Sequence, residues 1–392
     1  MKILRVIPSI DPKEGGPIAG ARNIDSELIK NGHTVEVVCL DEPAAEKIAL
    51  SYPAKVNLIP GSSGHYRYNS KLINWLKENS GRFDAVIVNG LWQFHSFAVW
   101  RALAKSNTPY FVYTHGMLDP WFKKAYPLKH LKKWLYWPWA EYRVLRDAAA
   151  VFFTSEEEQL QSRKSFWLYS CNEIITPYGT LPPPTDSEKL KSLFLSNFPE
   201  LSNKKIILFL SRIHEKKGCD ILIEAFSKVF SEKDDYHLVI AGPDQTGWVE
   251  QLKDRAKALG ISSKITWPGM LQGDMKWGAF YASEAYCLPS HQENFGIAVA
   301  EALSCGTPVL ISNKVNIWRE IEASNSGFID TDTIEGTINS LNRLYNTSRD
   351  KLDLMKTSAL KISQEKFNIG NAAIELIKTI TLTKNNKNIS RK

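Results

Sequence analysis

Residues 285–301, with the sequence AYCLPSHQENFGIAVAE, decide the fold. The apolar run at 285–288 is typical of a buried strand, and Pro289 ends it. A loop leads through Gly296 into a segment of helical composition, and Gly306 is typical of a helix end. A strand, a loop and a helix in this order form the repeating unit of a parallel α/β sheet.

The same unit recurs along the rest of the chain. Near the N-terminus, a strand-like run at 3–7 precedes the break Gly15-Gly16-Pro17, a helical apolar pattern over 18–29 and a second strand-like run at 34–39. Further strand candidates are residues 85–88, 110–113, 149–153, 205–210, 237–241, 264–267 and 307–311. The alternation predicts two parallel α/β halves of similar size.

A proline-rich break at residues 177–184 separates the two halves, as expected of an interdomain linker. We predict an N-terminal domain over 1–182, a C-terminal domain over 183–367 and a final helix over 368–392. Ligands of parallel sheets bind beyond the carboxyl ends of the strands. Two such edges facing each other would form a deep cleft.

The composition is that of a globular protein, with 43% hydrophobic and 23% charged residues. The N-terminal apolar run is too short for a signal peptide, so we expect a cytoplasmic location. The five cysteines are odd in number and form no Cys-x-x-Cys pair, which favours reduced thiols. The net charge of +7 favours anionic partners, such as phosphorylated ligands and anionic lipid headgroups. No nucleic-acid-binding motif accompanies the basic residues, so we expect no nucleic-acid partner.

Two carboxylates flank the predicted start of the helix in the 285–301 stretch. Glu293 lies in the loop and Glu301 in the helix. Carboxylates accept hydrogen bonds from sugar hydroxyls, and the free N–H groups of a helix N-terminus can hold a phosphate. The alternative is an ordinary strand–loop–helix connection with two solvated glutamates.

The stretch resembles the Glu-x7-Glu motif of retaining glycosyltransferases, especially glycosyltransferase family 4, and the resemblance covers essentially the whole chain. It implies two Rossmann-like domains that face each other across a cleft, the GT-B architecture. It also implies that the final helix packs back on the N-terminal domain. The implied activity is retaining transfer of a hexosyl unit from a nucleotide-diphosphate sugar, UDP- or GDP-linked, to a saccharide or lipid-linked glycan acceptor. Cell-surface polysaccharide or glycoconjugate synthesis is the implied setting.

The resemblance assigns roles within the motif residue by residue. Glu293 would contact the donor sugar near the reaction centre, and Glu301 would hold the ribose hydroxyls of the nucleotide. The backbone between them would meet the sugar and the diphosphate at Asn294, Phe295, Gly296 and Ile297.

A second loop, LSRIHEKKG at residues 210–218, follows the strand candidate 205–210. A leaving nucleoside diphosphate gains negative charge, which two nearby cations would stabilise. The resemblance assigns this role to Arg212 and Lys217, the lysine directly before Gly218. A solvated charged loop is the alternative.

Three weaker matches complete the implied site. His115 follows the strand candidate 110–113, and the resemblance places a histidine there, near the donor sugar. Gly15 and Gly16 match a loop that borders the diphosphate and the acceptor, although a plain turn is the alternative. Gly269 and Met270 match the stretch that lies against the nucleobase.

No Asp-x-Asp string suited to a divalent ion lies in these motifs, so we expect no metal and no cofactor apart from the nucleotide sugar as co-substrate. The alternatives within the fold are another nucleotide-sugar enzyme, such as an epimerase, and a carbohydrate-binding or scaffold protein on a decayed GT-B fold.

Residues 121–146 combine eight aromatic residues with seven lysines and arginines. This mixture suits the surface of an anionic membrane, where aromatic rings and basic side chains meet the headgroups. It also suits a groove for a sugar chain, or a packed helix with one solvated face. The sequence leaves these three interpretations open.

Overall fold

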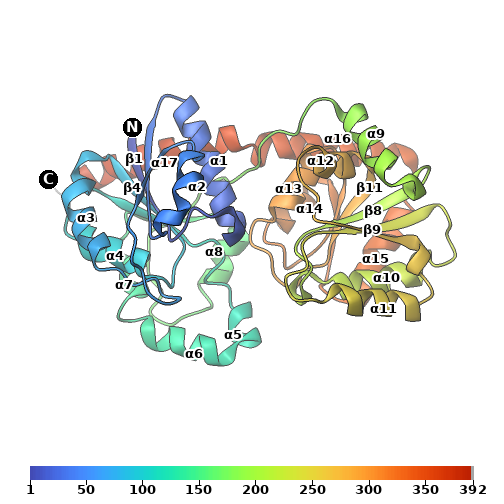
Figure 1. Cartoon of the computed structure of the whole chain (residues 1–392), viewed down its shortest axis with the longest axis horizontal. Helices are drawn as coiled ribbons and strands as arrows, with labels where there is room; N and C mark the ends of the chain where they lie inside the picture. The colour runs from blue at the N-terminus through green and yellow to red at the C-terminus, as the bar shows by residue number, and fades with distance from the viewer. Residues whose placement is uncertain (390–392) are drawn as a thin grey trace. The chain divides into compact units, whose positions relative to one another are not determined.

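The computed structural model describes residues 1–389 of the chain, and their side chains up to residue 385. The chain forms two compact units. Unit 1 comprises Met1–Gly179 together with the C-terminal segment from Ile369, and unit 2 comprises Thr180–Asn368. Each unit is a parallel sheet with helices on its faces (Figure 1).

The sheet of unit 1 has seven strands in the order β3-β2-β1-β4-β5-β6-β7. The strands are β1 (Lys2–Val6), β2 (Thr34–Cys39), β3 (Lys55–Leu58), β4 (Ala85–Asn89), β5 (Tyr110–Tyr113), β6 (Ala150–Phe153) and β7 (Glu173–Ile175). The helices are α1 (Gly16–Lys30), α2 (Glu46–Leu50), α3 (Lys71–Asn79), α4 (Phe94–Leu103), α5 (Trp121–Ala125), α6 (Pro127–Tyr136), α7 (Glu141–Asp147), α8 (Glu156–Ser162) and α17 (Ile369–Ile389). The final helix α17 packs against α1, and the end of the predicted helix, residues 390–392, lies outside the described residues.

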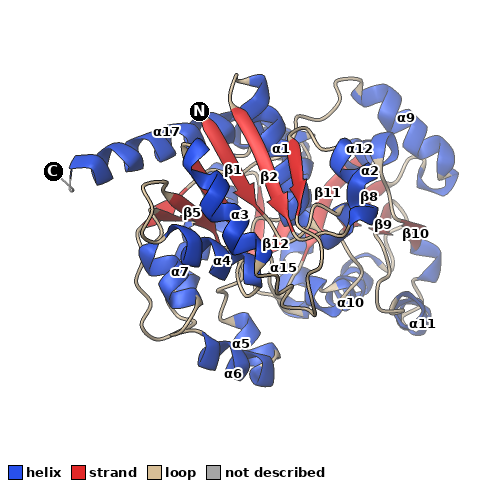
Figure 2. Ribbon diagram, turned by 60° about the vertical axis from the view of Figure 1, so that its left-hand side comes forward, coloured by secondary structure: helices blue, strands red, loops and turns tan. Residues whose placement is uncertain are grey.

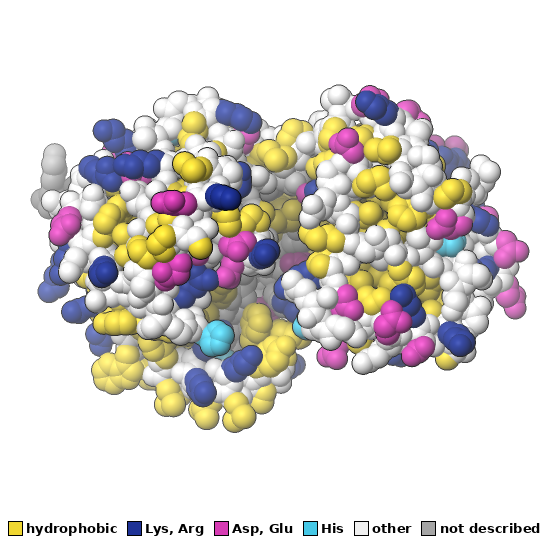
Figure 3. All heavy atoms as spheres, viewed as in Figure 1, with side chains coloured by type: hydrophobic (Ala, Val, Ile, Leu, Met, Phe, Trp, Pro, Cys, Tyr) yellow, Lys and Arg dark blue, Asp and Glu magenta, His cyan; other side chains and the backbone are white. Residues whose placement is uncertain are grey.

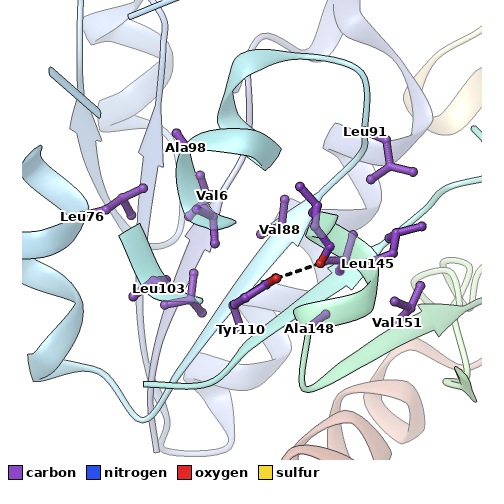
Figure 4. Close-up of a cluster of buried hydrophobic side chains, with 14 of the residues drawn as sticks. Val6, Leu76, Val88, Leu91, Ala98, Leu103, Tyr110, Leu145, Ala148 and Val151 are labelled. Carbon is purple, nitrogen blue, oxygen red and sulfur yellow. Dashed lines mark hydrogen bonds between the residues drawn. The ribbon is translucent and has the colours of Figure 1, made fainter. Parts of the chain in front are cut away.

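The core of unit 1 lies on one face of this sheet, beneath α3, α4 and α7. Its side chains include Val6, Val88, Leu103 and Val151, which are completely or almost completely buried (Figure 4). The Tyr110 hydroxyl reaches into this core and donates a hydrogen bond to the carbonyl oxygen of Val144, at 2.8 Å. On the opposite face of the central strands, Ile87, Phe111 and Phe152 are also completely buried, as in parallel sheets covered by helices on each side.

The sheet of unit 2 has six strands in the order β10-β9-β8-β11-β12-β13. The strands are β8 (Lys205–Leu210), β9 (Tyr236–Ala241), β10 (Ile265–Gly269), β11 (Ser283–Leu288), β12 (Val309–Ser312) and β13 (Gly327–Asp330). The helices are α9 (Ser187–Asn197), α10 (Cys219–Phe230), α11 (Val249–Ala258), α12 (Gly273–Ala282), α13 (Ile297–Ser304), α14 (Trp318–Ser324), α15 (Ile334–Tyr345) and α16 (Arg349–Lys366). Figure 2 shows the strands of each sheet running side by side between these helices.

Both sheets have a point where the strand order reverses. In unit 1 this point lies between β1 and β4, and in unit 2 between β8 and β11. Crossovers on the two sides of such a point lead to opposite faces of the sheet, which leaves a crevice at the carboxyl ends of the two strands. The loops after these four strands therefore occupy the favoured ligand-binding position of each unit.

The predicted fold class is confirmed, but the sequence interpretation missed three strands. They are β3, β7 and β13, which lie at sheet edges and are only partly buried. An edge strand is covered on fewer sides, so it need not be a continuous apolar run. Without such a run, the sequence pattern does not distinguish the strand from a loop. All five cysteines are free thiols, as expected from their number and spacing.

Candidate functional site

The two loops at the reversal point of unit 2 contact each other closely. Gly218, with φ of 71°, lies so near the second loop that a Cβ atom there would be 2.4 Å from the carbonyl oxygen of Pro289. The backbone N–H of His291 donates to the carbonyl oxygen of Lys216 at 2.9 Å. The hydroxyl of Ser290 donates to the same oxygen, also at 2.9 Å. The loop after β8 and the loop after β11 thus form one connected structure.

Lys217 and Glu293 form an ion pair across these two loops. The Lys217 side chain is 5% exposed and that of Glu293 is 23% exposed, so the pair is reached mainly from the glutamate side. Burial acts to raise the pKa of Glu293, but the charge and hydrogen bond of Lys217 outweigh it and hold the pKa below its usual value. Glu293 is therefore a carboxylate at neutral pH.

The backbone around Glu293 is fixed from both sides. Its N–H donates to the carbonyl oxygen of Lys314 at 2.9 Å, and its own carbonyl oxygen accepts from the N–H of Asn316 at 3.0 Å. The N–H of Asn294 donates to Oε1 of Glu293 at 3.1 Å, while Oε2 faces Lys217. The carboxylate therefore has a fixed orientation before any ligand binds.

Helix α13 begins directly after this carboxylate. Gly296, in the left-handed conformation with φ of 71°, caps the helix and, as a glycine, bonds no side chain to its first turn. Phe295 is buried and packs edge-on against Phe367. The first turn, which starts at Ile297, thus presents backbone N–H groups beside the loop, in the arrangement that suits an anion.

Glu301 lies in the second turn of α13 and has a cationic partner that the sequence interpretation missed. Its Oε1 is 2.7 Å from the Nζ of Lys276, on α12, whose ammonium group also lies over the ring of Trp277. Burial raises the pKa of Glu301, and Lys276 opposes this rise. Lys276 lies outside every motif, so only the packing of α12 beside α13 could have revealed it.

The remaining residues predicted in unit 2 are less enclosed. Arg212 is exposed, and its Nη1 is 3.5 Å from Oε1 of Gln245, so it does not join the Lys217–Glu293 pair. Gly269 ends β10 with φ of 72°, and its carbonyl oxygen accepts from the N–H of Gly242 at 2.8 Å. Met270 is 60% exposed. Within residues 1–389, no group of three or more His, Cys, Asp or Glu side chains is placed to hold a metal ion.

The predicted residues of unit 1 lie at the carboxyl edge of its own sheet. Gly15, with φ of 104°, caps α1 without a side-chain hydrogen bond, and Gly16 is the first residue of that helix. His115 is half-buried in the loop after β5 and stacks on Tyr113. Desolvation of the ring, and secondarily the positive charge of Arg5, lower the pKa of His115 to about 3. The imidazole is therefore neutral at physiological pH.

The segment 121–146 is divided by the structure into a packed part and an exposed part. Helix α7 contributes buried side chains to the core of unit 1, as does Trp137 just before it. Helix α6, in contrast, has no buried residue. One side of α6 nevertheless packs on unit 1, because His130 stacks on Phe166 and Lys133 lies over the ring of Trp92. The interpretation as a packed helix with one exposed face therefore fits α6, and the two other interpretations stay open.

Two family profiles match consecutive parts of the chain. Residues 15–167 match the glycosyl transferase 4-like domain, and residues 195–359 match the glycosyl transferases group 1. The chain belongs to the group 1 glycosyltransferases.

Sequence relatives of this glycosyltransferase match only part of its length. It is 32% identical over 124 residues to the mannosylfructose-phosphate synthase of Agrobacterium fabrum, covering 30% of this chain and 27% of that protein. It is 36% identical over 121 residues to the phosphatidyl-myo-inositol mannosyltransferase of Mycobacterium leprae, covering 30% of each. The chain thus matches less than a third of the length of these curated relatives.

A solved structure is similar over almost the whole glycosyltransferase chain. It is that of Anabaena HepE in complex with UDP and glucose, with a TM-score of 0.75 and 17% identity over 97% of this chain and 99% of that one. At this level of identity the likeness establishes the shared two-domain GT-B fold.

Proposed function

We propose that the protein transfers a hexosyl unit, with retention of anomeric configuration, from a nucleotide-diphosphate sugar to a saccharide or lipid-linked acceptor. The observation that carries this proposal is the presence of two partly buried ion pairs on either side of the α13 N-terminus, Lys217–Glu293 and Glu301–Lys276. Anabaena HepE, which binds UDP and glucose, shares the fold and supports UDP as the nucleotide.

The chemistry of the donor fits this arrangement. The N-terminus of α13 suits the diphosphate, and Lys217 with Arg212 suits the negative charge that develops on it as the glycosidic bond breaks. The Glu293 carboxylate suits the positive charge that develops at the anomeric carbon, and Glu301 suits two neighbouring ribose hydroxyls. Because cations of the chain would stabilise the leaving group, we propose transfer without a metal ion.

Kinetics of two isosteric variants would test these roles, once a panel of nucleotide sugars has identified the donor. Glu293→Gln removes a charge used mainly in the transition state, so kcat should fall at least about tenfold. Glu301→Gln should mainly raise the KM for the donor, because ribose contacts change little between ground and transition states. Glu284→Gln, a partly buried glutamate of β11 near Arg349, is the matched control.

Each outcome of that experiment decides something. Full kcat in Glu293→Gln would contradict its place at the reaction centre. Nucleotide-sugar binding without turnover would indicate a carbohydrate-binding protein on this fold. NMR of the product would show whether configuration is retained, and activity after treatment with EDTA would show whether a metal is needed.

We further propose that the protein works at the surface of an anionic membrane, where a lipid-linked acceptor would be presented. The carrying observation is an exposed face of α6, on which Leu128, Leu131 and Leu135 are 78%, 55% and 60% exposed. Their spacing places them on one side of the helix. Trp139, at 69% exposure, follows the helix. We call these four residues the apolar face; hydrophobic side chains gather around α6 at the lower edge of Figure 3.

The charge around the apolar face favours this partner. Five lysines and no acidic residue occur between Asp119 and Glu141; the lysines are Lys123, Lys124, Lys129, Lys132 and Lys133. Each basic residue near an anionic bilayer contributes about 1 kcal/mol, and each fully buried leucine about 1.5–3 kcal/mol. Together, the electrostatic contribution of the lysines and the hydrophobic contribution of the leucines suit reversible attachment of the protein to the membrane surface. Within residues 1–389, no helix has the length and apolar character needed to cross a bilayer.

Binding to vesicles of mixed phosphatidylglycerol and phosphatidylcholine would test the membrane proposal. Binding should weaken with salt, and Lys129→Gln with Lys132→Gln should reduce both the affinity and its salt dependence. Leu131→Gln with Leu135→Gln should reduce affinity and keep the salt dependence. Leu354→Gln, on α16 and 68% exposed, is the control. No vesicle binding at low salt would reject the proposal, and binding of an oligosaccharide by the same face would replace it.

A further inference from the structure

A continuous chain of buried polar side chains runs from α1 to His115 within unit 1. Arg5, on β1, donates from Nε and Nη2 to the carboxylate of Asp25, at 2.8 and 2.6 Å. The Nη1 of the same guanidinium group donates to Oδ1 of Asn89, at the end of β4, at 2.6 Å. The amide Nδ2 of Asn89 is in turn 2.9 Å from Nε2 of His115. Arg5 and Asp25 are 1% and 0% exposed, so this chain is sheltered from solvent.

The donor and acceptor roles along this chain determine which nitrogen of His115 carries the hydrogen. A guanidinium group can only donate, so the Asn89 atom that faces Arg5 must be the carbonyl oxygen. The amide nitrogen then faces His115, and it too can only donate. Nε2 of His115 must therefore accept with its lone pair, which leaves the ring hydrogen on Nδ1.

The backbone that carries His115 is held just as firmly. The residue is in the left-handed conformation, with φ of 49°. Oε1 of Glu158, on α8, accepts from the Thr114 hydroxyl at 2.7 Å and from the N–H of Gly116 at 2.6 Å, so one carboxylate oxygen holds both neighbours. The ring meets that of Tyr178 in a T-shaped arrangement, with 6.0 Å between ring centroids. Both the place and the tilt of the imidazole are thus set by the protein.

We infer that Asn89, held by the Arg5–Asp25 pair, is a positioning residue that keeps His115 a neutral donor through Nδ1–H toward the bound substrate. This inference rests on the proposed function, and it deepens it. His115 then supplies a hydrogen bond of fixed direction and takes no part in proton transfer.

The electrostatic surroundings agree with a neutral ring. Among the described residues, the charged and titratable groups that contact His115 or its hydrogen-bonded neighbours are Arg5, Asp25, Tyr113, Glu158 and Tyr178. Of these, Arg5 carries the positive charge that adds to desolvation in lowering the pKa of His115. Protonation of Nε2 would also place a hydrogen against the Asn89 amide, which has no lone pair to receive it.

NMR of the full chain with ¹⁵N-labelled histidine tests the tautomer without any variant of Asn89. The signal of His115 is identified by its loss in His115→Gln. We expect Nε2 without hydrogen, Nδ1 with hydrogen, and no titration between pH 5 and 8. A hydrogen on Nε2, or a titration within that range, would overturn the inference. The NMR result stands whether or not transfer is observed, whereas failure to transfer from any nucleotide sugar would reject the proposed function alone.

Asn89→Asp gives a second test that a merely structural role would not pass. The new carboxylate would accept a hydrogen from Nε2 and raise the pKa of His115. Below that pKa the ring carries hydrogen on both nitrogens and keeps its Nδ1 donor. Above it the remaining hydrogen stays on Nε2, so kcat relative to the unaltered protein should fall about tenfold as pH rises.

Asn172→Asp is the matched control, since its amide donates to the carbonyl oxygen of Ala149 at 2.8 Å, away from His115. Its activity relative to the unaltered protein should not change with pH. If Asn89→Asp also gave a constant ratio, reduced equally at every pH, Asn89 would be structural and the inference would be wrong.

Discussion

Glu141, at the first position of α7, is a buried carboxyl group with only half of its hydrogen-bonding capacity used. Its Oε1 accepts from the N–H of Trp92 at 2.7 Å and from the hydroxyl of Ser96 at 2.9 Å. Oε2 is buried and has no hydrogen-bond partner among the described residues. Burial raises the pKa of Glu141 to about 7, against the opposing effect of these hydrogen bonds and of Lys133. The ionised form is therefore costly in the folded state.

This residue should make unit 1 less stable as pH rises. The folded state holds the Glu141 proton up to about pH 7, whereas the unfolded chain loses it near the ordinary value of 4.5, so the loss of stability falls between these values. The full loss is about 3 kcal/mol. In Glu141→Gln the difference in unfolding free energy between pH 5 and pH 8 should shrink by most of this amount, because only a minor part of the loss occurs below pH 5; denaturant titration would measure it. Glu46→Gln, at an exposed position, should keep the original difference; an unchanged difference in Glu141→Gln would contradict the prediction.

Single-residue roles were only partly predictable from the sequence. The motifs placed Glu293 and Lys217 in two loops, but nothing in the amino-acid sequence showed that the two side chains form an ion pair. Glu141 and Asn89 carry no motif, because their behaviour comes from neighbours distant in sequence. A polar residue at a strand end, as Asn89 is at the end of β4, is the one signal that could have drawn attention to it.

At the scale of elements, the loops after β8 and β11 depend on Gly218. We predict that Gly218→Ala destabilises unit 2 more than Gly247→Ala, although both glycines have φ of 71°. The conformational cost, about 1–2 kcal/mol, is common to both substitutions. Only at Gly218 does the added Cβ meet Pro289, whereas nothing lies within 4 Å of it at Gly247.

The extra cost at Gly218 should be about 1–3 kcal/mol, the usual range for an overfilled site. Thermal denaturation of both variants would measure the difference, and UDP affinity would show whether the loops separate. Equal stability of the two variants would mean that the loops move apart freely.

Strands that are buried in the centre of a sheet were easier to predict from the sequence than strands at its edges. Central strands such as β4 and β11 contain continuous apolar runs, at residues 85–88 and 285–288, and these runs predicted the strands correctly. The edge strands β3, β7 and β13 lack such runs. The exposure of α6 was also hidden, because its amphipathic pattern fits a packed helix as well as one that meets an external surface.

At the scale of the whole molecule, unit 2 is one uninterrupted stretch whose two ends meet. The N–H of Thr180 donates to the carbonyl oxygen of Phe367 at 2.9 Å. We therefore expect a fragment of residues 180–368 to fold alone, to unfold cooperatively and to bind UDP. A fragment of residues 1–179 should be less stable, because it lacks α17, whose Ala372, Leu376 and Ile380 are completely buried. Circular dichroism and calorimetry would compare the two, and a molten 180–368 fragment would contradict the expectation.

The division of the chain into two domains was predictable where the composition of the sequence changes. The prolines near residue 180 indicate a break, and the α/β alternation restarts after it. The apolar spacing over 371–382 indicates a helix, but this spacing does not identify the surface against which the helix packs. That information lies in the complementarity of α1 and α17, which are far apart in sequence.

The contact between α1 and α17 also sets an order of events during translation. The ribosome makes the seven strands of unit 1 first, then all of unit 2, and only then the helix that covers α1. Domains usually fold as units while they emerge, from the N-terminus onward. In this protein, the synthesis of unit 1 begins first, but one face of its helix α1 stays uncovered until unit 2 has been synthesised. A nascent chain therefore exposes this face for most of its elongation, and a chaperone that shields apolar surface would find its target there.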